Sequence, residues 1–179
     1  MSDKKKSQFL VISALGSDRP GIVDELTRPI QETGGNILDS RMTVLGGEFA
    51  ALLLVEGGWD TIARLEKILP KLTPKLQVMT KRTEEQEEKE SALPYIVNVV
   101  ALDHPGIVNQ LAAFFAKREI NIYNLETDSY HAPHTGSLMF SANLTVSITA
   151  SFSIVQLRSE FLEFCDSLNL DAIFEPMKG

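Results

Sequence analysis

Apolar residues along this chain recur with two different spacings, and these alternate in the same order in each half of the sequence. The runs Phe9–Leu15 and Tyr95–Leu102 are mostly apolar and contain several Val and Ile residues, which is typical of buried strands. After each run, apolar residues return every three or four positions, the spacing of a helix with one buried face. These positions are Ile22, Leu26 and Ile30 in the first half, and Ile107, Leu111 and Phe115 in the second.

Each predicted helix is followed by two strands, a second helix and a last strand. The paired strands are expected at residues 36–45 and 49–56, and again at 121–130 and 137–148. The second helix has apolar residues on one face, namely Ile62, Leu65, Leu69 and Leu72, and then Ile154, Leu157, Phe161, Cys165 and Leu168. Ser153 and Gln156 are expected to form a capping box. The last strands alternate through Leu76, Val78 and Thr80, and through Leu170, Ala172 and Phe174.

This order of elements predicts an α+β protein with two ferredoxin-like βαββαβ domains in tandem. Each would be a four-stranded antiparallel sheet with two helices on one face, over residues 8–82 and 93–177. The segment 83–92 is rich in glutamate and is expected to be a solvated acidic linker, with a docking strip for a basic partner as the alternative. Domains this small gain stability when they bury a face against a neighbour, so the sequence is compatible with a homo-oligomer.

Two short motifs repeat at a constant offset of 85 positions. Asp18–Val23 returns as Asp103–Val108, and the pair Asn36-Ile37 returns as Asn121-Ile122. In this topology the first two strands run parallel with the third between them, so the two motifs lie at opposite ends of one domain. A two-fold relation between the domains would place the turn of each near the asparagine of the other. We expect two related sites there.

The residue types in these motifs suit a small zwitterion. Glycine at a helix start costs about 1 kcal/mol relative to alanine, and one reason to keep it is close approach of a carboxylate to the free helix N–H groups. An aspartate can accept from an ammonium group, and an asparagine can both donate and accept. The isoleucines would leave little room for a ligand side chain. The candidate ligand-binding residues are Asp18, Gly21, Ile22, Asn36, Asp103, Gly106, Ile107 and Asn121.

A purely structural interpretation of the same residues stays open. Proline is favoured in the first helical turn, and the aspartate could cap the helix. Asparagine at the start of a strand could simply close a turn.

The Asp-Arg-Pro-Gly-Ile-Val turn that opens a helix, followed by Gly-Asn-Ile at the second strand, resembles the ACT domain family over nearly the whole chain. The resemblance implies that an amino acid contacts the loop after the first strand and the start of the second, which are the eight residues named above. His104 stands where the first copy has Arg19, so the two sites are expected to differ in affinity.

Two ACT domains with little else resemble a family of bacterial regulators of the glycine cleavage operon. This resemblance implies a cytoplasmic repressor without a DNA-binding motif. It would act through contact with a LysR-type activator protein, with glycine as the effector that relieves repression. The alternative is a generic ACT-type amino-acid sensor that regulates an enzyme allosterically.

The charge of the chain argues against direct contact with nucleic acid. The formal net charge is -7 and the sequence pI is about 5.0, whereas proteins that grip a polyanion usually present a basic face. The basic cluster Lys4–Lys6 is expected to be a solvated tail. RNA-recognition motifs share the βαββαβ order but need paired aromatic residues on the third strand, and here Phe49 and Phe140 each stand alone.

Catalytic and metal-binding motifs are not apparent in the sequence. There is no Ser/His/Asp set, phosphate-binding loop or dinucleotide motif, so we expect no enzyme activity and no cofactor. His131 and His134, with Asp128 nearby, are too few for a firm zinc site, and a polar loop is the expected reading. Cys165 is expected to be a buried, inert thiol. No apolar run is long enough to span a membrane, and Phe9–Leu15 is too short for a signal peptide.

Overall fold

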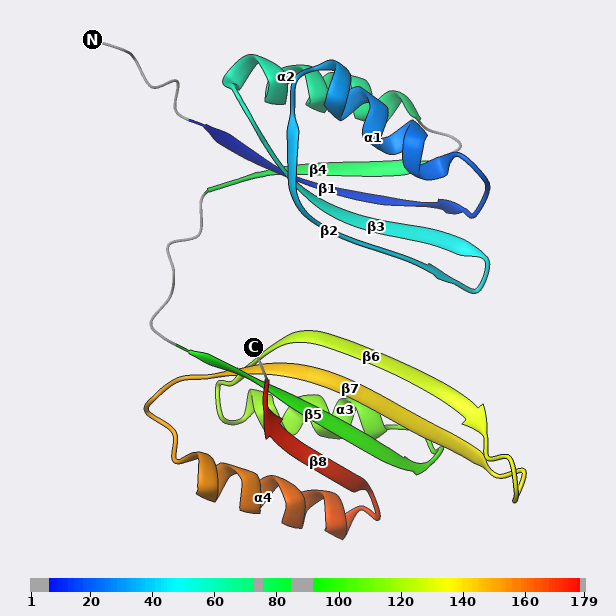
Figure 1. Cartoon of the computed structure of the whole chain (residues 1–179), viewed down its shortest axis with the longest axis vertical. Helices are drawn as coiled ribbons and strands as arrows, with labels where there is room; N and C mark the ends of the chain where they lie inside the picture. The colour runs from blue at the N-terminus through cyan, green and yellow to red at the C-terminus, as the bar shows by residue number, and fades with distance from the viewer. Residues whose placement is uncertain (1–6, 73–75, 85–91, 178–179) are drawn as a thin grey trace. The chain divides into compact units, whose positions relative to one another are not determined.

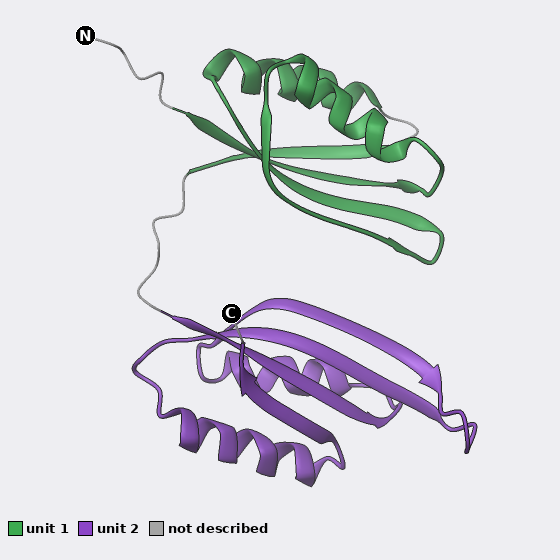
Figure 2. Ribbon diagram, in the orientation of Figure 1, with its two compact units in different colours: residues 1–87 green, residues 88–179 purple. Residues whose placement is uncertain are grey.

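The computed structural model describes residues 7–72, 76–84 and 92–177 of the 179-residue chain. It divides into two compact units, residues 1–87 and 88–179 (Figure 2). Each unit has a four-stranded antiparallel sheet with two helices on one face (Figure 1), so the predicted α+β fold of two ferredoxin-like modules is confirmed. The basic tail Lys4–Lys6 and most of the predicted linker 83–92 lie outside the described residues.

The two units repeat the same order of elements. Unit 1 contains β1 (Gln8–Ser17), α1 (Ile22–Glu32), β2 (Asn36–Leu45), β3 (Glu48–Gly57), α2 (Trp59–Ile68), a 3₁₀ turn (Leu69–Leu72) and β4 (Gln77–Thr83). Unit 2 contains β5 (Leu93–Leu102), α3 (Ile107–Ala116), β6 (Asn121–His131), β7 (Leu138–Ile148), α4 (Ile154–Ser167) and β8 (Asp171–Pro176). The strand orders are β2-β3-β1-β4 and β6-β7-β5-β8, which places the first and second strands of each unit parallel with the third between them.

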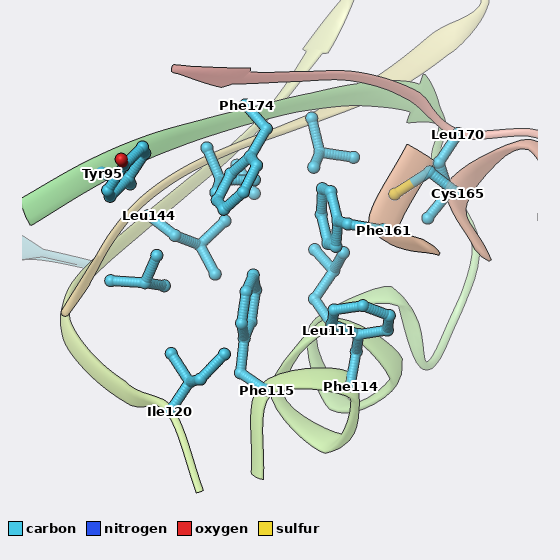
Figure 3. Packing of buried hydrophobic residues seen from close by; sticks show 14 of the residues in the cluster. Tyr95, Leu111, Phe114, Phe115, Ile120, Leu144, Phe161, Cys165, Leu170 and Phe174 are labelled. Carbon is cyan, nitrogen blue, oxygen red and sulfur yellow. The ribbon is translucent and has the colours of Figure 1, made fainter. Parts of the chain in front are cut away.

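Each unit buries its own hydrophobic core between sheet and helices. In unit 1 the inward side chains of β1 and β3 meet the apolar face of α1, whose buried residues are Ile22, Leu26 and Ile30. The core of unit 2 contains a group of packed aromatic rings (Figure 3), in which Phe115 and Phe161 are stacked at a centroid distance of 5.3 Å. The two cores are separate clusters, so each unit carries its own hydrophobic stabilisation.

The helix ends depart from the sequence expectation in two places. The second helix of unit 1 ends at Ile68 and continues as a 3₁₀ turn, which contains Pro70 with its missing N–H group. The predicted capping box is wrong. Ser153 is the N-cap of α4 but makes no side-chain cap hydrogen bond, and the Gln156 amide instead donates to Glu160, one turn further on, at 2.8 Å. None of the described helices is long and apolar enough to cross a membrane.

A β-bulge follows the repeated Asn-Ile pair in both units. The register of β2 against β3 shifts between Ile37 and Asp39, and that of β6 against β7 shifts between Ile122 and Asn124. A bulge inserts one extra residue and increases the local twist of an edge strand. The shared position of the bulge shows that the internal repeat extends to fine details of the backbone.

Candidate functional site

In each unit, a backbone hydrogen bond joins the loop between the first strand and the first helix to the hairpin of the second and third strands. The Asp18 N–H donates to the Gly47 carbonyl at 2.9 Å, and the Asp103 N–H donates to the Leu138 carbonyl at 3.0 Å. Both acceptors lie at the end of the sheet where the second strand passes into the third. The backbone of the two candidate loops is therefore held in the same way in both copies.

Gly21 and Gly106 are the N-caps of their helices and not residues of the first helical turn. Their φ values are +86° and +98°, a left-handed conformation that a side chain disfavours. The expectation that Pro20 and Pro105 lie in the first helical turn is wrong, because both precede the N-cap. The reading of the aspartate as a capping side chain is also wrong, since neither helix has a side-chain cap hydrogen bond. The glycines are required by backbone conformation alone, whether or not a ligand approaches.

In unit 1 the loop forms one side of an open hollow whose other side comes from β2 and β3. Asp18, Gly21 and Ile22 lie on the loop side, and Met42 and Val44 lie opposite them. Further lining residues are Arg19, Val23, Asp24, Thr27, Thr43 and Phe49. The sequence analysis missed the β2 residues, although the parallel order of β1 and β2 already places the far end of β2 beside the loop. The hollow combines a carboxylate and a helix start with an apolar wall, which suits a small polar molecule.

The isoleucines of the motif belong to the cores. Ile22 is 2% exposed and Ile107 is 1% exposed, and each packs within its own unit. Packing alone explains why both copies keep an isoleucine there, so these two residues are weaker indicators of a ligand than the polar members of the motif.

Neither unit brings its own asparagine to its own loop. Asn36 pairs with Glu56, and Asn121 pairs with Ser147, at the end of each sheet opposite the loop. This separation is the one expected from the topology. Both asparagines are exposed. The meeting of each loop with the asparagine of another module stays a prediction.

The two loops differ in the side chains that surround them. In unit 1, Arg19 forms an ion pair with Glu25 in the first turns of α1. At the corresponding positions unit 2 has His104, whose Nδ1 lies 3.2 Å from the carbonyl of Pro105, and Gln110. The Gln110 Oε1 is buried and has no hydrogen-bond partner among the described residues. Unit 2 thus lacks the ion pair that fixes the loop side chain in unit 1.

Other candidate chemistry in the chain has a structural explanation. Cys165 is 1% exposed on the inner face of α4, and burial raises the pKa of its thiol to about 12, with a smaller contribution from the charge of Asp166. His131 ends β6, and His134 lies in the following turn. Within the described ranges, no group of three or more His, Cys, Asp or Glu side chains could hold a metal ion.

Comparison with known proteins places this geometry in context. The family model of the ACT domain matches residues 8–83. The glycine cleavage system transcriptional repressor of Escherichia coli K12 is 32% identical over 163 residues, which cover 90% of this chain and 86% of that protein. A crystal structure described as a putative glycine cleavage system transcriptional repressor is 31% identical, with a TM-score of 0.74 over 97% of this chain and 99% of that one. A crystal structure described as an unknown protein from Galdieria sulphuraria is 28% identical, with a TM-score of 0.80 over 97% of this chain and 100% of that one.

Proposed function

Because this chain belongs to the family of the glycine cleavage system transcriptional repressor, we propose that it represses the glycine cleavage operon in response to a small amino acid. Repression would run through contact with a LysR-type activator protein in the cytoplasm, and glycine would relieve it. The observation that carries this proposal is the match to the Escherichia coli repressor over 90% of the chain, which includes both units.

The effector would bind at the loops that follow β1 and β5. Several features support this assignment: the first-turn N–H groups of α1 and α3, although that of Ile22 already donates to the Arg19 carbonyl at 3.3 Å, the adjacent aspartates, and the hollow beside Asp18. The ligand carboxylate would accept hydrogen bonds from the helix N–H groups, and its ammonium group would donate to Asp18 or Asp103. Asn36 and Asn121 of a neighbouring module would complete the two sites.

Contact with a protein fits this chain better than contact with DNA. The formal net charge is -7, and in the described part of the chain six arginines are each paired with an acidic side chain, which disfavours contact with phosphates. We also propose that the chain has no catalytic activity of its own, since its described residues are accounted for by two regulatory modules.

The decisive experiment measures capture of the activator and binding of glycine separately. The full chain, immobilised, is expected to retain the LysR-type activator of the glycine cleavage operon from the same organism, and added glycine is expected to release it. Calorimetry with glycine, serine, leucine and phenylalanine is expected to give binding for glycine and progressively weaker binding for the larger side chains.

Two outcomes would redirect the proposal. Amino-acid binding without capture of the activator would favour the alternative, an ACT-type sensor that regulates an enzyme. If the activator is captured but no amino acid changes its capture, an amino-acid effector is excluded and the chain is a constitutive repressor.

A further inference from the structure

The face of the unit 1 sheet that points away from its helices is more apolar than a solvated face needs to be. We call this surface the outer face of unit 1 (Figure 1). It includes Phe9, Val11, Ser13, Leu15, Asp39, Arg41, Ala50, Leu52, Leu54, Met79 and Lys81, together with the polar residues Thr43, Glu56, Gln77 and Thr83. An antiparallel sheet usually carries polar residues on its free face. Here Leu52 is 50% exposed and Met79 is 74% exposed. Exposed apolar surface of this kind marks an interaction site.

One row of residues across this face has opposite charges at its two ends. The strand register places Asp39 of β2 beside Leu54 of β3, Leu54 beside Val11 of β1, and Val11 beside Lys81 of β4. The row therefore runs from an anion at one edge of the sheet, through two apolar residues, to a cation at the other edge. Arg41, in the neighbouring row, pairs with Asp39 and holds that carboxylate on the outer face.

Such a row is complementary to itself. A two-fold axis parallel to the strands, between two copies of the face, places β2 of each copy over β4 of the other. Asp39 of one copy then faces Lys81 of the second copy, and Leu54 faces Val11, with both contacts made twice. An isologous interface requires this kind of self-complementarity, and matched charges fix its register.

The same row in unit 2 lacks this property. Its residues are Asn124, Thr145, Ile96 and Glu175, with an anion at one end and no cation. In the next row, Asn143 donates to Asn98 at 2.8 Å, so these two side chains satisfy each other on the surface. This face resembles an ordinary solvated sheet face, and the same two-fold arrangement of two copies would place Glu175 opposite Asn124, without a pair of opposite charges.

The outer face of unit 1 also has an open hollow. Its lining is mostly apolar and includes Phe9, Val11, Leu52 and Leu54, together with the charged residues Asp39, Arg41 and Glu84. We propose that the outer face of unit 1 is the interface of a homodimer, in which the Asp39–Leu54–Val11–Lys81 row of one copy packs against the same row of a second copy. The sheets would pack face to face at about 10 Å, the usual spacing of stacked sheets.

Charge reversal tests this proposal without any ligand. Sedimentation equilibrium of the full chain is expected to show a dimer, and Lys81→Glu is expected to weaken the dimer on the order of 10- to 100-fold, because it places two anions opposite each other at both ends of the interface. The double variant Asp39→Lys with Lys81→Glu exchanges both charges and is expected to restore the dimer. A mixture of the single variants Asp39→Lys and Lys81→Glu is expected to form a heterodimer.

Glu175→Lys is the matched control, because Glu175 occupies the position of Lys81 in the sheet of unit 2. It is expected to leave the dimer unchanged. A wild-type chain that is monomeric at every soluble concentration would overturn the proposal, as would equal weakening by Lys81→Glu and Glu175→Lys. A double variant that stays as weak as the single variants would overturn the self-complementary arrangement. Circular dichroism of each variant verifies that the sheet is intact, and none of these outcomes depends on glycine binding.

Discussion

The hydroxyl of Ser129 donates a hydrogen bond to the carboxylate of Asp103 at 3.2 Å, which joins β6 to the loop before α3. At the corresponding position unit 1 has Val44, which cannot donate. Among the residues that the structure describes, no side chain donates to the carboxylate of Asp18. Two aspartates that are equivalent in the repeat are therefore unequal as acceptors, and the one in unit 1 is free to accept from a ligand.

Asp18→Asn is expected to weaken glycine binding by roughly 10- to 100-fold. A hydrogen bond between an ammonium group and a carboxylate contributes about 1.5–3 kcal/mol, and each 1.4 kcal/mol is a factor of ten in affinity. Calorimetry on the full chain measures this change together with the number of glycine molecules bound per chain.

Asp103→Asn is the matched variant at the second loop. Its effect on glycine affinity is expected to be smaller, because Asp103 already has a partner in Ser129. An equal loss from the two variants would show that this internal hydrogen bond gives way to the ligand. If neither variant lowers the glycine affinity, neither aspartate contacts the ligand.

Gly21→Ala is expected to lower the free energy of unfolding by about 1–2 kcal/mol, the cost of a left-handed conformation for a residue with a side chain. A Cβ at this position would meet nothing within 4 Å, so backbone conformation alone sets the penalty. The control is Gly58→Ala, at another helix N-cap with open space but with φ at -68°. Urea denaturation of the two variants compares them, and equal losses would contradict the conformational explanation.

The strands and helices were predictable from the sequence because the apolar spacing switches cleanly between two periods. Val11 and Leu10 illustrate the limit of that pattern. The alternation shows that they point to opposite faces of β1, but both are apolar, so the sequence does not indicate which of them enters the core. Leu10 is fully buried, and Val11 lies on the outer face beside Leu54 and Lys81.

The candidate site was only partly predictable. The repeat identified the polar residues of the loops, but a repeat cannot separate a ligand contact from a residue kept for conformation. Gly21 is explained by its positive φ and Ile22 by its burial. The contribution of Met42 depends on the packing of β2 beside the loop, which involves residues far apart in the chain.

Phe115→Ala is expected to destabilise unit 2 by about 3–5 kcal/mol and to leave unit 1 unchanged, because the cores are separate. Ile30→Ala is the matched variant at the equivalent position of unit 1, with an expected loss of about 2–5 kcal/mol there. Trp59 is the single tryptophan of the chain and lies in unit 1, so its fluorescence reports on that unit alone. A shift of the Trp59 transition in Phe115→Ala would show that the two units unfold together.

The buried thiol of Cys165 is expected to make the protein less stable at alkaline pH. Its pKa is raised to about 12 in the folded chain, whereas an unfolded cysteine ionises at about 8.5, so between these values the unfolded state loses a proton that the folded state keeps. The stabilisation is fully present below about pH 8.5 and is lost as the pH rises toward the folded value, with a slope of at most about 1.4 kcal/mol per pH unit. Cys165→Ala removes this pH dependence of the stability. The tyrosines and lysines are the same in the wild-type protein and in the variant, so their contribution cancels in the comparison. Urea denaturation at several values from pH 8 to pH 10 is therefore expected to show a shallower decline for the variant. Parallel declines would mean that the Cys165 thiol ionises as readily in the folded chain as in the unfolded one.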